Sequence, residues 1–191
     1  MNADSFKGQI AIVTGAGQGI GFEICRQLAL QGASVLLNDV DDSLTQSCVK
    51  KIKAEGGNCI GLSGDASDVD FINEMVKQAV NNFGKLTIAI ANAGITLFAD
   101  FFDYTPDSFS KVMQLNLGGS FFLAQAAAKQ MKQQQTGGSI LFTAEEVSFS
   151  SISFNKTEAP CKESCLQISK PMPWPAPVTI ATCPFNGSVI I

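Results

Sequence analysis

A glycine-rich segment near the N-terminus, Thr14-Gly15-Ala16-Gly17-Gln18-Gly19-Ile20-Gly21, constrains the fold most strongly. It follows an apolar run at 10–13 and leads into an amphipathic stretch that continues to Gln31. A buried strand that turns directly into a helix brings several backbone N–H groups and the positive end of the helix dipole to one point. Phosphate binds at such points, so the segment predicts a dinucleotide site. A glycine-rich hairpin or an ordinary tight turn is the alternative.

The glycines are predicted to have separate roles. Gly15 allows the tight reversal, Gly19 lets the backbone approach a pyrophosphate, and Gly21 lets the helix lie close to the strand. The spacing fits T-G-x-x-x-G-x-G and does not fit G-x-G-x-x-G. It resembles the fingerprint of the short-chain dehydrogenase/reductase family. The resemblance implies a cofactor-binding loop that contains Thr14, Gly15, Gln18, Gly19, Ile20 and Gly21.

A carboxylate stands at the end of the second predicted strand. A helix at 20–31 and a buried strand that begins at 33–37 complete a βαβ unit, and this strand ends at Asn38-Asp39. In dinucleotide folds an acid at this place holds the adenosine ribose hydroxyls. Asp39 would repel the 2′-phosphate of NADP, and Val40 offers no cation to it, so NAD is the predicted cofactor. The alternative is that Asp39 only ends the strand and begins an acidic turn.

The rest of the first 143 residues repeats the same alternation of helices and strands. Further elements are expected at 43–55 (helix), 58–63 (strand), 67 to about 83 (helix, opened by Ser67 and Asp68), 86–91 (strand), a long helix after Thr105, and 139–143 (strand). Residues 1–143 are therefore predicted to be one dinucleotide-binding domain of the α/β class. Its doubly wound parallel sheet should have the strand order 3-2-1-4-5.

Three further segments strengthen the family resemblance. They are Asp65-Ala66 after the third strand, Asn92-Ala93-Gly94 after the fourth, and Asn116 within the long helix. The resemblance implies that the first contacts adenine, that the second supports the central sheet and approaches the cofactor, and that Asn116 is a catalytic residue of a proton relay. The residues themselves leave open a turn or cap role for Asp65 and a helix kink at Asn116.

The family resemblance ends after residue 143. The family continues with a Ser-Ser pair and then a helix bearing Tyr-x-x-x-Lys, whereas the first position here is Ala144-Glu145 and the single tyrosine, Tyr104, lies elsewhere. Glu158 and Lys162 occupy the Tyr and Lys positions, with Pro160 between them to disrupt a helix. Glu replaces a phenol as acid only with a large rise in its pKa. We therefore expect little or no dehydrogenase activity.

Residues 144–191 form a Ser- and Pro-rich segment that is expected to be poorly ordered. A frame change or alternative splice near codon 144 would produce such a segment. Two function classes remain open at this point. One is an oxidoreductase that transfers a hydride between NAD(H) and a small-molecule alcohol or carbonyl substrate. The other is a non-catalytic dinucleotide-binding or interaction module.

Composition excludes several other functions. The net charge of −4 predicts no nucleic-acid partner. No leader pattern and no apolar run of roughly 18 residues are found, so we expect a cytoplasmic protein without membrane association. The absence of histidine excludes His-based triads, and the Cys161-x-x-x-Cys165 spacing is too weak to predict a metal. Family members commonly form homo-oligomers, and loss of the Tyr-Lys helix should weaken that contact.

Overall fold

The computed structural model describes residues 5–143, so the predictions for 144–191, including those for Glu158 and Lys162, lie outside the described residues. Strands and helices alternate along this part. The strands are β1 (Ile10–Val13), β2 (Ser34–Asp39), β3 (Asn58–Ser63), β4 (Ile88–Ala91) and β5 (Ser139–Phe142). The helices are α1 (Gly19–Leu30), α2 (Asp42–Ala54), α3 (Val69–Phe83), α4 (Pro106–Met113), the π-helix η1 (Gln114–Gly119) and α5 (Ser120–Gln133).

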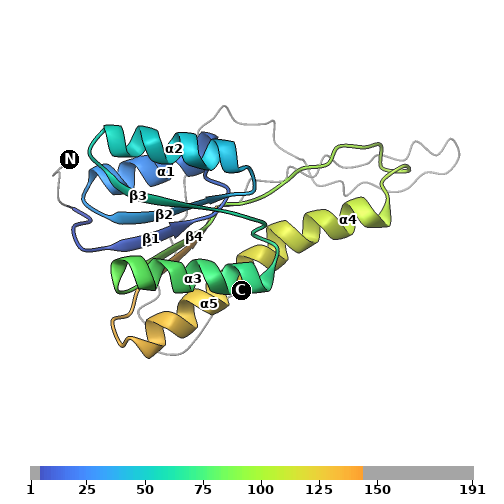
Figure 1. The fold of residues 1–191 in the computed structure, drawn as a ribbon. Helices are drawn as coiled ribbons and strands as arrows, with labels where there is room; N and C mark the ends of the chain where they lie inside the picture. Colours follow the sequence, from blue (N-terminus) through green and yellow to red (C-terminus); the bar gives the residue numbers. More distant parts are fainter. Residues whose placement is uncertain (1–4, 144–191) are drawn as a thin grey trace, which may run out of the picture. The chain divides into compact units, whose positions relative to one another are not determined.

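The strands form one parallel sheet in the order β3-β2-β1-β4-β5, which confirms the predicted topology. Helices α1 and α2 cover one face, and α3 and α5 cover the other (Figure 1). The central strand β1 pairs with β2 and β4, with Ile12 beside Leu36 on one side and Ala89 on the other. This crossover order places the carboxyl ends of β1 to β4 along one edge of the sheet.

Two apolar cores explain why the strands are continuous apolar runs. Successive residues of a strand point to opposite faces, and Ala11 and Val13 join the core under α1 and α2. Ile10 and Ile12 join the core with α3 and α5. All four residues of β1 are buried, as expected for a strand covered on both faces.

Helices α1 and α2 begin and end one residue before their predicted bounds of 20–31 and 43–55, and α3 begins at Val69, after the predicted opening at Ser67 and Asp68. Asp41, Asp68 and Thr105 cap α2, α3 and α4 by accepting backbone N–H bonds. Gly32 and Gly84 follow α1 and α3 with φ of 93° and 86°, a conformation that favours glycine.

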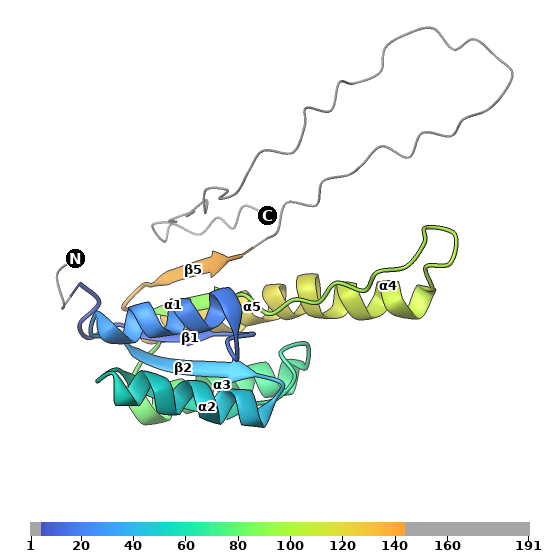
Figure 2. The same cartoon turned by 90° about the horizontal axis from the view of Figure 1, so that it is seen from above.

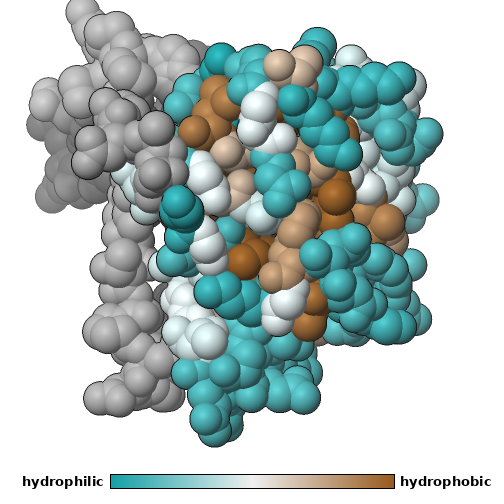
Figure 3. Space-filling view, turned by 60° about the vertical axis from the view of Figure 1, so that its left-hand side comes forward, coloured by the Kyte–Doolittle hydropathy of each residue, from teal (hydrophilic) through white to brown (hydrophobic). Residues whose placement is uncertain are grey.

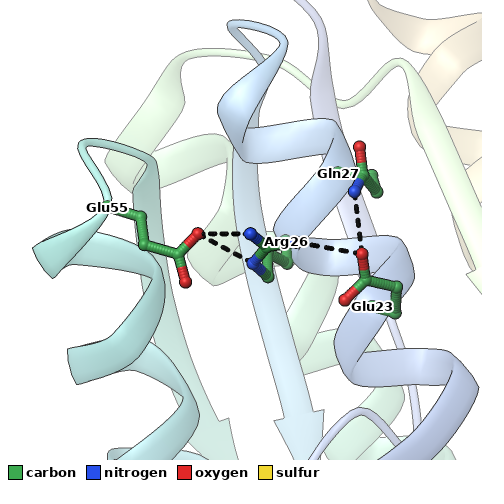
Figure 4. A network of polar contacts seen from close by, with 4 residues as sticks. All are labelled: Glu23, Arg26, Gln27 and Glu55. Atoms are coloured by element: carbon green, nitrogen blue, oxygen red, sulfur yellow. Dashed lines mark hydrogen bonds and ion pairs between the residues drawn. The ribbon is translucent and has the colours of Figure 1, made fainter.

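A surface ion-pair network joins α1 to the end of α2 (Figure 4). Arg26 Nη2 lies 2.7 Å from Glu55 Oε2, and its Nη1 lies 3.0 Å from Glu23 Oε1, which also accepts from Gln27. These side chains are exposed or half-exposed, so solvent screens the pairs and they add little to the stability of the fold.

The long helix that the sequence predicts after Thr105 is continuous from 106 to 133 but contains the π-helical turn η1. Figures 1 and 2 show α4 and the loop before it projecting beyond the carboxyl ends of the strands. No residue of α4 is buried, and its exposed apolar side chains include Phe109 and Met113. Apolar residues are also exposed among polar ones on the face shown in Figure 3. Within 5–143 no helix is long and apolar enough to cross a membrane.

Candidate functional site

The glycine loop lies between the end of β1 and the start of α1. Gly15 and Gly19 have φ of 62° and 58°, which an L side chain rarely adopts. A Cβ on Gly15 would lie 2.7 Å from Ala93 Cα, and one on Gly21 would lie 2.5 Å from Gly15 O. The reversal at Gly15 and the close approach at Gly21 are therefore built as the sequence predicts.

The first turn of α1 is open. A Cβ on Gly19 would have no atom within 4 Å, so the backbone here is accessible from outside. Helix α1 has no side-chain cap at Gln18 and no acidic residue in its first turn, whereas α2, α3 and α4 have both. Its free N–H groups and unopposed dipole suit a phosphate. This open first turn, beside a loop with no room for side chains at Gly15, fits a dinucleotide.

Asp39 closes the loop from the end of β2. Its Oδ2 accepts a hydrogen bond from Gly17 N at 2.8 Å, and its Oδ1 accepts one from Asp41 N at 3.1 Å. A Cβ on Gly17 would lie 2.7 Å from Asp39 Cγ. Sequence reasoning missed Gly17, which occupies a variable position of the glycine pattern. The only signal was a glycine beyond those that the pattern requires.

Thr14 and Asn92 tie β1 to β4. Thr14 Oγ1 accepts from Asn92 N and Ala93 N, both at 3.1 Å. Asn92 Nδ2 donates to Thr14 O and Gly15 O, both at 3.0 Å. Thr143 Oγ1 donates to Asn92 Oδ1 at 3.1 Å and brings the end of β5 into the same network. The sequence singled out Thr14 and Asn92 but not this role of Thr143.

Asn116 lies in η1 and holds the backbone that follows Gly94. Its Oδ1 accepts from Ile95 N at 2.9 Å, and its Nδ2 donates to Ile95 O at 3.0 Å. A Cβ on Gly94 would lie 3.4 Å from Asn116 Oδ1, so the two residues are adjacent. π-Helical turns are frequent at functional sites. The structure thus gives Asn116 a specific partner besides its place in an irregular helix.

Asp65 and Ala66 lie in the loop after β3. Asp65 Oδ1 accepts from Ser67 N at 2.8 Å, which is the turn role that the sequence left open. Ala66 is buried, and a Cβ on Gly119 would lie 2.5 Å from Ala66 O. The end of η1 therefore packs against this loop.

Asn38 positions the neighbouring ends of β2 and β3, a role that the sequence did not indicate. Its side chain is only 1% exposed. Its Nδ2 donates to Leu62 O at 3.1 Å and to Gly64 O at 3.0 Å. The backbone adds a bond from Gly64 N to Asp39 O at 2.9 Å. Asp39 and Asp65 are thus held at fixed places on adjacent strand ends.

Tyr104 does not lie at the edge of the sheet where the strands end. Tyr104 precedes α4, and the helix from Pro106 to Asn116 is about 15 Å long at 1.5 Å per residue.

The described residues include no group of three or more His, Cys, Asp or Glu that could hold a metal. Cys25, Cys48 and Cys59 are buried free thiols.

The sequence matches the protein-family model described as short chain dehydrogenase over residues 9–156. This match extends beyond residue 143, where the motif-based resemblance ends. Versicolorin reductase stcU of Emericella nidulans is 37% identical over 145 residues, which are 74% of this chain and 54% of that protein. L-Rhamnose 1-dehydrogenase (NAD(P)(+)) of a Sphingomonas species is 40% identical over 136 residues, which are 71% of this chain and 54% of that protein.

A solved structure supports the same assignment. A short-chain type dehydrogenase/reductase from Mycobacterium marinum superposes with a TM-score of 0.71 at 31% identity, covering 74% of this chain and 57% of that one. The chain spans about half the length of the curated relatives it matches.

Proposed function

This chain belongs to the short-chain dehydrogenase family, and on that premise we propose that its glycine loop and Asp39 bind NAD(H). The reaction is hydride transfer between this cofactor and a small-molecule alcohol or carbonyl compound. The bond between Gly17 N and Asp39 Oδ2 carries the proposal, because it joins the phosphate-binding loop to the residue that would hold the ribose.

The preference for NAD over NADP follows from charge. Asp39 has an oxygen lone pair left on each carboxylate atom for ribose hydroxyls after it accepts its two backbone bonds. Asp41 and Asp42 follow Asp39 at the start of α2, and the exposed residue between them and Asp39 is the apolar Val40. A 2′-phosphate would meet negative charge and no cation there.

The chain's own residues have distinct tasks in this proposal. The open first turn of α1 binds the pyrophosphate, and Asp65 with the Ala66 backbone meets the adenine ring. Asn92 keeps the ends of β1 and β4 together under the cofactor. Asn116 fixes the Ile95 backbone and supports a proton relay. When bound, the nicotinamide ring supplies the hydride donor or acceptor.

Calorimetric titration of NAD into the full chain tests the binding proposal. The matched variants are Gly19→Ala and Gly56→Ala. Both glycines have positive φ and open space at the Cβ. Replacing either one by alanine should therefore lower the free energy of unfolding by a similar amount, about 1 kcal/mol. Only Gly19 lies in the loop. We expect Gly19→Ala to weaken NAD binding and Gly56→Ala to leave it unchanged; equal effects, or no NAD binding by the natural chain, would contradict the proposal.

A non-catalytic dinucleotide-binding module is the second candidate function. The position of Tyr104 favours it, because the intervening helix separates the chain's single tyrosine from Asn116. A group able to exchange a proton near neutral pH must lie within hydrogen-bond reach of the substrate oxygen. Loss of such a group typically costs 10²–10⁴ in rate. Steady-state turnover on a panel of alcohols and ketones separates the two candidates, and loss of any turnover in Glu158→Gln would assign that carboxyl as the acid.

A further inference from the structure

The peptide groups on both sides of Gly17 are held in place, one by Asp39 and the other by a thiol of α2. We propose that Cys48 is a positioning residue of the dinucleotide loop. By binding the Gly17 carbonyl, its thiol directs the Gln18 N–H away from α2 and toward the phosphate. This inference rests on the proposed NAD(H) binding and adds a residue to that site.

The contact is specific in the structure. Cys48 Sγ donates to Gly17 O at 3.1 Å, although the two residues are far apart in the sequence. Cys48 is 4% exposed and packs in the core beneath α1 and α2. The thiol is therefore held in place by α2 and reaches the glycine loop from the core side. The Gly17 carbonyl cannot turn toward the phosphate without breaking this bond.

The thiol remains a donor at neutral pH. Burial raises the pKa of Cys48, and the Asp39 carboxylate adds to the rise, while Lys51 opposes it. A thiol is a weak donor, but the Gly17 carbonyl is buried against it and a lost partner would leave that oxygen unpaired. The S–H group is thus suited to hold the Gly17 carbonyl in place.

Peptide planarity transmits the effect to the ligand side. In a trans peptide the C=O and the following N–H point in opposite directions. Because the Gly17 carbonyl points toward α2, the Gln18 N–H points away from it. Within residues 5–143 the Gln18 N–H has no hydrogen-bond acceptor. It is followed by Gly19, whose outer face is open. A phosphate at this place would supply the missing acceptor.

The test compares ligands with and without phosphate. Cys48→Ala removes the donor, Cys48→Ser keeps one, and Cys59→Ala removes a thiol from the same core that contacts only the adjoining Ile60 carbonyl, at 3.6 Å. Binding of ADP-ribose and of adenosine to the full chain is measured by calorimetry. Hydrogen exchange at the Gln18 and Gly19 amides is measured by NMR in the absence of ligand.

We expect Cys48→Ala to weaken ADP-ribose binding roughly two- to tenfold and to leave adenosine binding unchanged. Its Gln18 and Gly19 amides should exchange faster, while Cys48→Ser and Cys59→Ala should resemble the natural chain. A merely structural role would weaken both ligands equally. Equal weakening, or unchanged ADP-ribose affinity in Cys48→Ala, would overturn this inference alone. Absence of ADP-ribose binding by the natural chain would overturn the proposed function and this inference with it.

Discussion

The backbone N–H of Gly17 donates to Oδ2 of Asp39 at 2.8 Å, so the glycine loop after β1 and the acid at the end of β2 form one unit. Gly17 leaves no space on its Asp39 side, since a Cβ there would lie 2.7 Å from both Asp39 Cγ and Oδ2. A residue of the loop outside the glycine fingerprint thus holds the carboxylate that we propose binds the ribose.

Gly17→Ala should therefore displace Asp39. The added methyl group overpacks the contact, and we expect a loss of about 1–3 kcal/mol in the free energy of unfolding together with roughly tenfold weaker NAD binding. Gly118→Ala is the control, because it adds the same methyl group where the nearest atom is 3.7 Å away. Urea unfolding and NAD calorimetry measure both effects, and an unchanged NAD affinity in Gly17→Ala would contradict the coupling.

Asp39→Asn should reduce the discrimination between NAD and NADP. The amide keeps the size of the side chain but removes the charge that repels a 2′-phosphate. We expect the ratio of the two dissociation constants to shift toward NADP by roughly tenfold, about 1.4 kcal/mol, which lies between the values for a close like-charge pair in bulk water and near a protein surface. Asp107→Asn removes a charge from the first turn of α4 and should leave the ratio unchanged. Similar affinities of the natural chain for both cofactors would refute the assignment.

Thr14→Val should be markedly destabilising, although the two side chains have the same shape. Thr14 is 3% exposed, and its Oγ1 accepts from Asn92 N and Ala93 N. Valine would leave these two backbone N–H groups unpaired, and each unpaired group should lower the free energy of unfolding by about 1–3 kcal/mol. Thr14→Ser keeps the acceptor and should recover most of this loss. Thermal unfolding of the two variants compares them directly, and equal midpoints would show that the hydroxyl is dispensable.

Asn38→Asp tests the link between β2 and β3. The substituted carboxylate would face the Leu62 and Gly64 carbonyl oxygens that the amide now donates to, and it would be buried without a cation. We expect a loss of about 3–5 kcal/mol in the free energy of unfolding. Asn58→Asp is the matched control, since Asn58 is exposed and its amide contacts only Ser34 Oγ. A difference of less than about 1 kcal/mol between the variants would show that Asn38 is not needed for this link.

The sheet order and most element ends could be predicted from the sequence, because they depend on local signals. The apolar runs of β1 and β4 are buried on both faces, and Asp68 and Thr105 are capping residues wherever a helix follows them. The predicted strand at 86–91 begins two residues later in the structure, at Ile88. Leu86 N donates to the Gln134 side chain, whereas the Thr87 backbone still bonds to Ile10 O and Ser139 N.

The contacts that complete the candidate site could not be predicted in the same way. Cys48 and Asn38 act on backbone groups that only the tertiary fold brings near them. The Asn116 side chain likewise pairs with the Ile95 backbone, a contact between distant residues that no helical periodicity encodes. Family resemblance identified Asn116 without predicting its partner.

Alkaline pH should destabilise the described domain through its buried thiols. Burial raises the pKa of Cys59 from 9.0 to about 12 and that of Cys25 well above 9.0. The folded state therefore keeps these protons where the unfolded chain has lost them. Stability from this source is complete below pH 9 and falls as the pH rises toward 12, by at most about 1.4 kcal/mol per pH unit for each thiol.

Cys59→Ala should flatten this decline between pH 9 and 12 while lowering stability at pH 7. Val49→Ala is the control, because it removes buried methyl groups from the same core without removing a titrating group. Its stability should be lower at every pH, with the slope of the natural chain. Denaturant unfolding at a series of pH values gives the slopes. A slope in Cys59→Ala equal to that of Val49→Ala would mean that the thiol of Cys59 ionises at the same pH in the folded and unfolded chain.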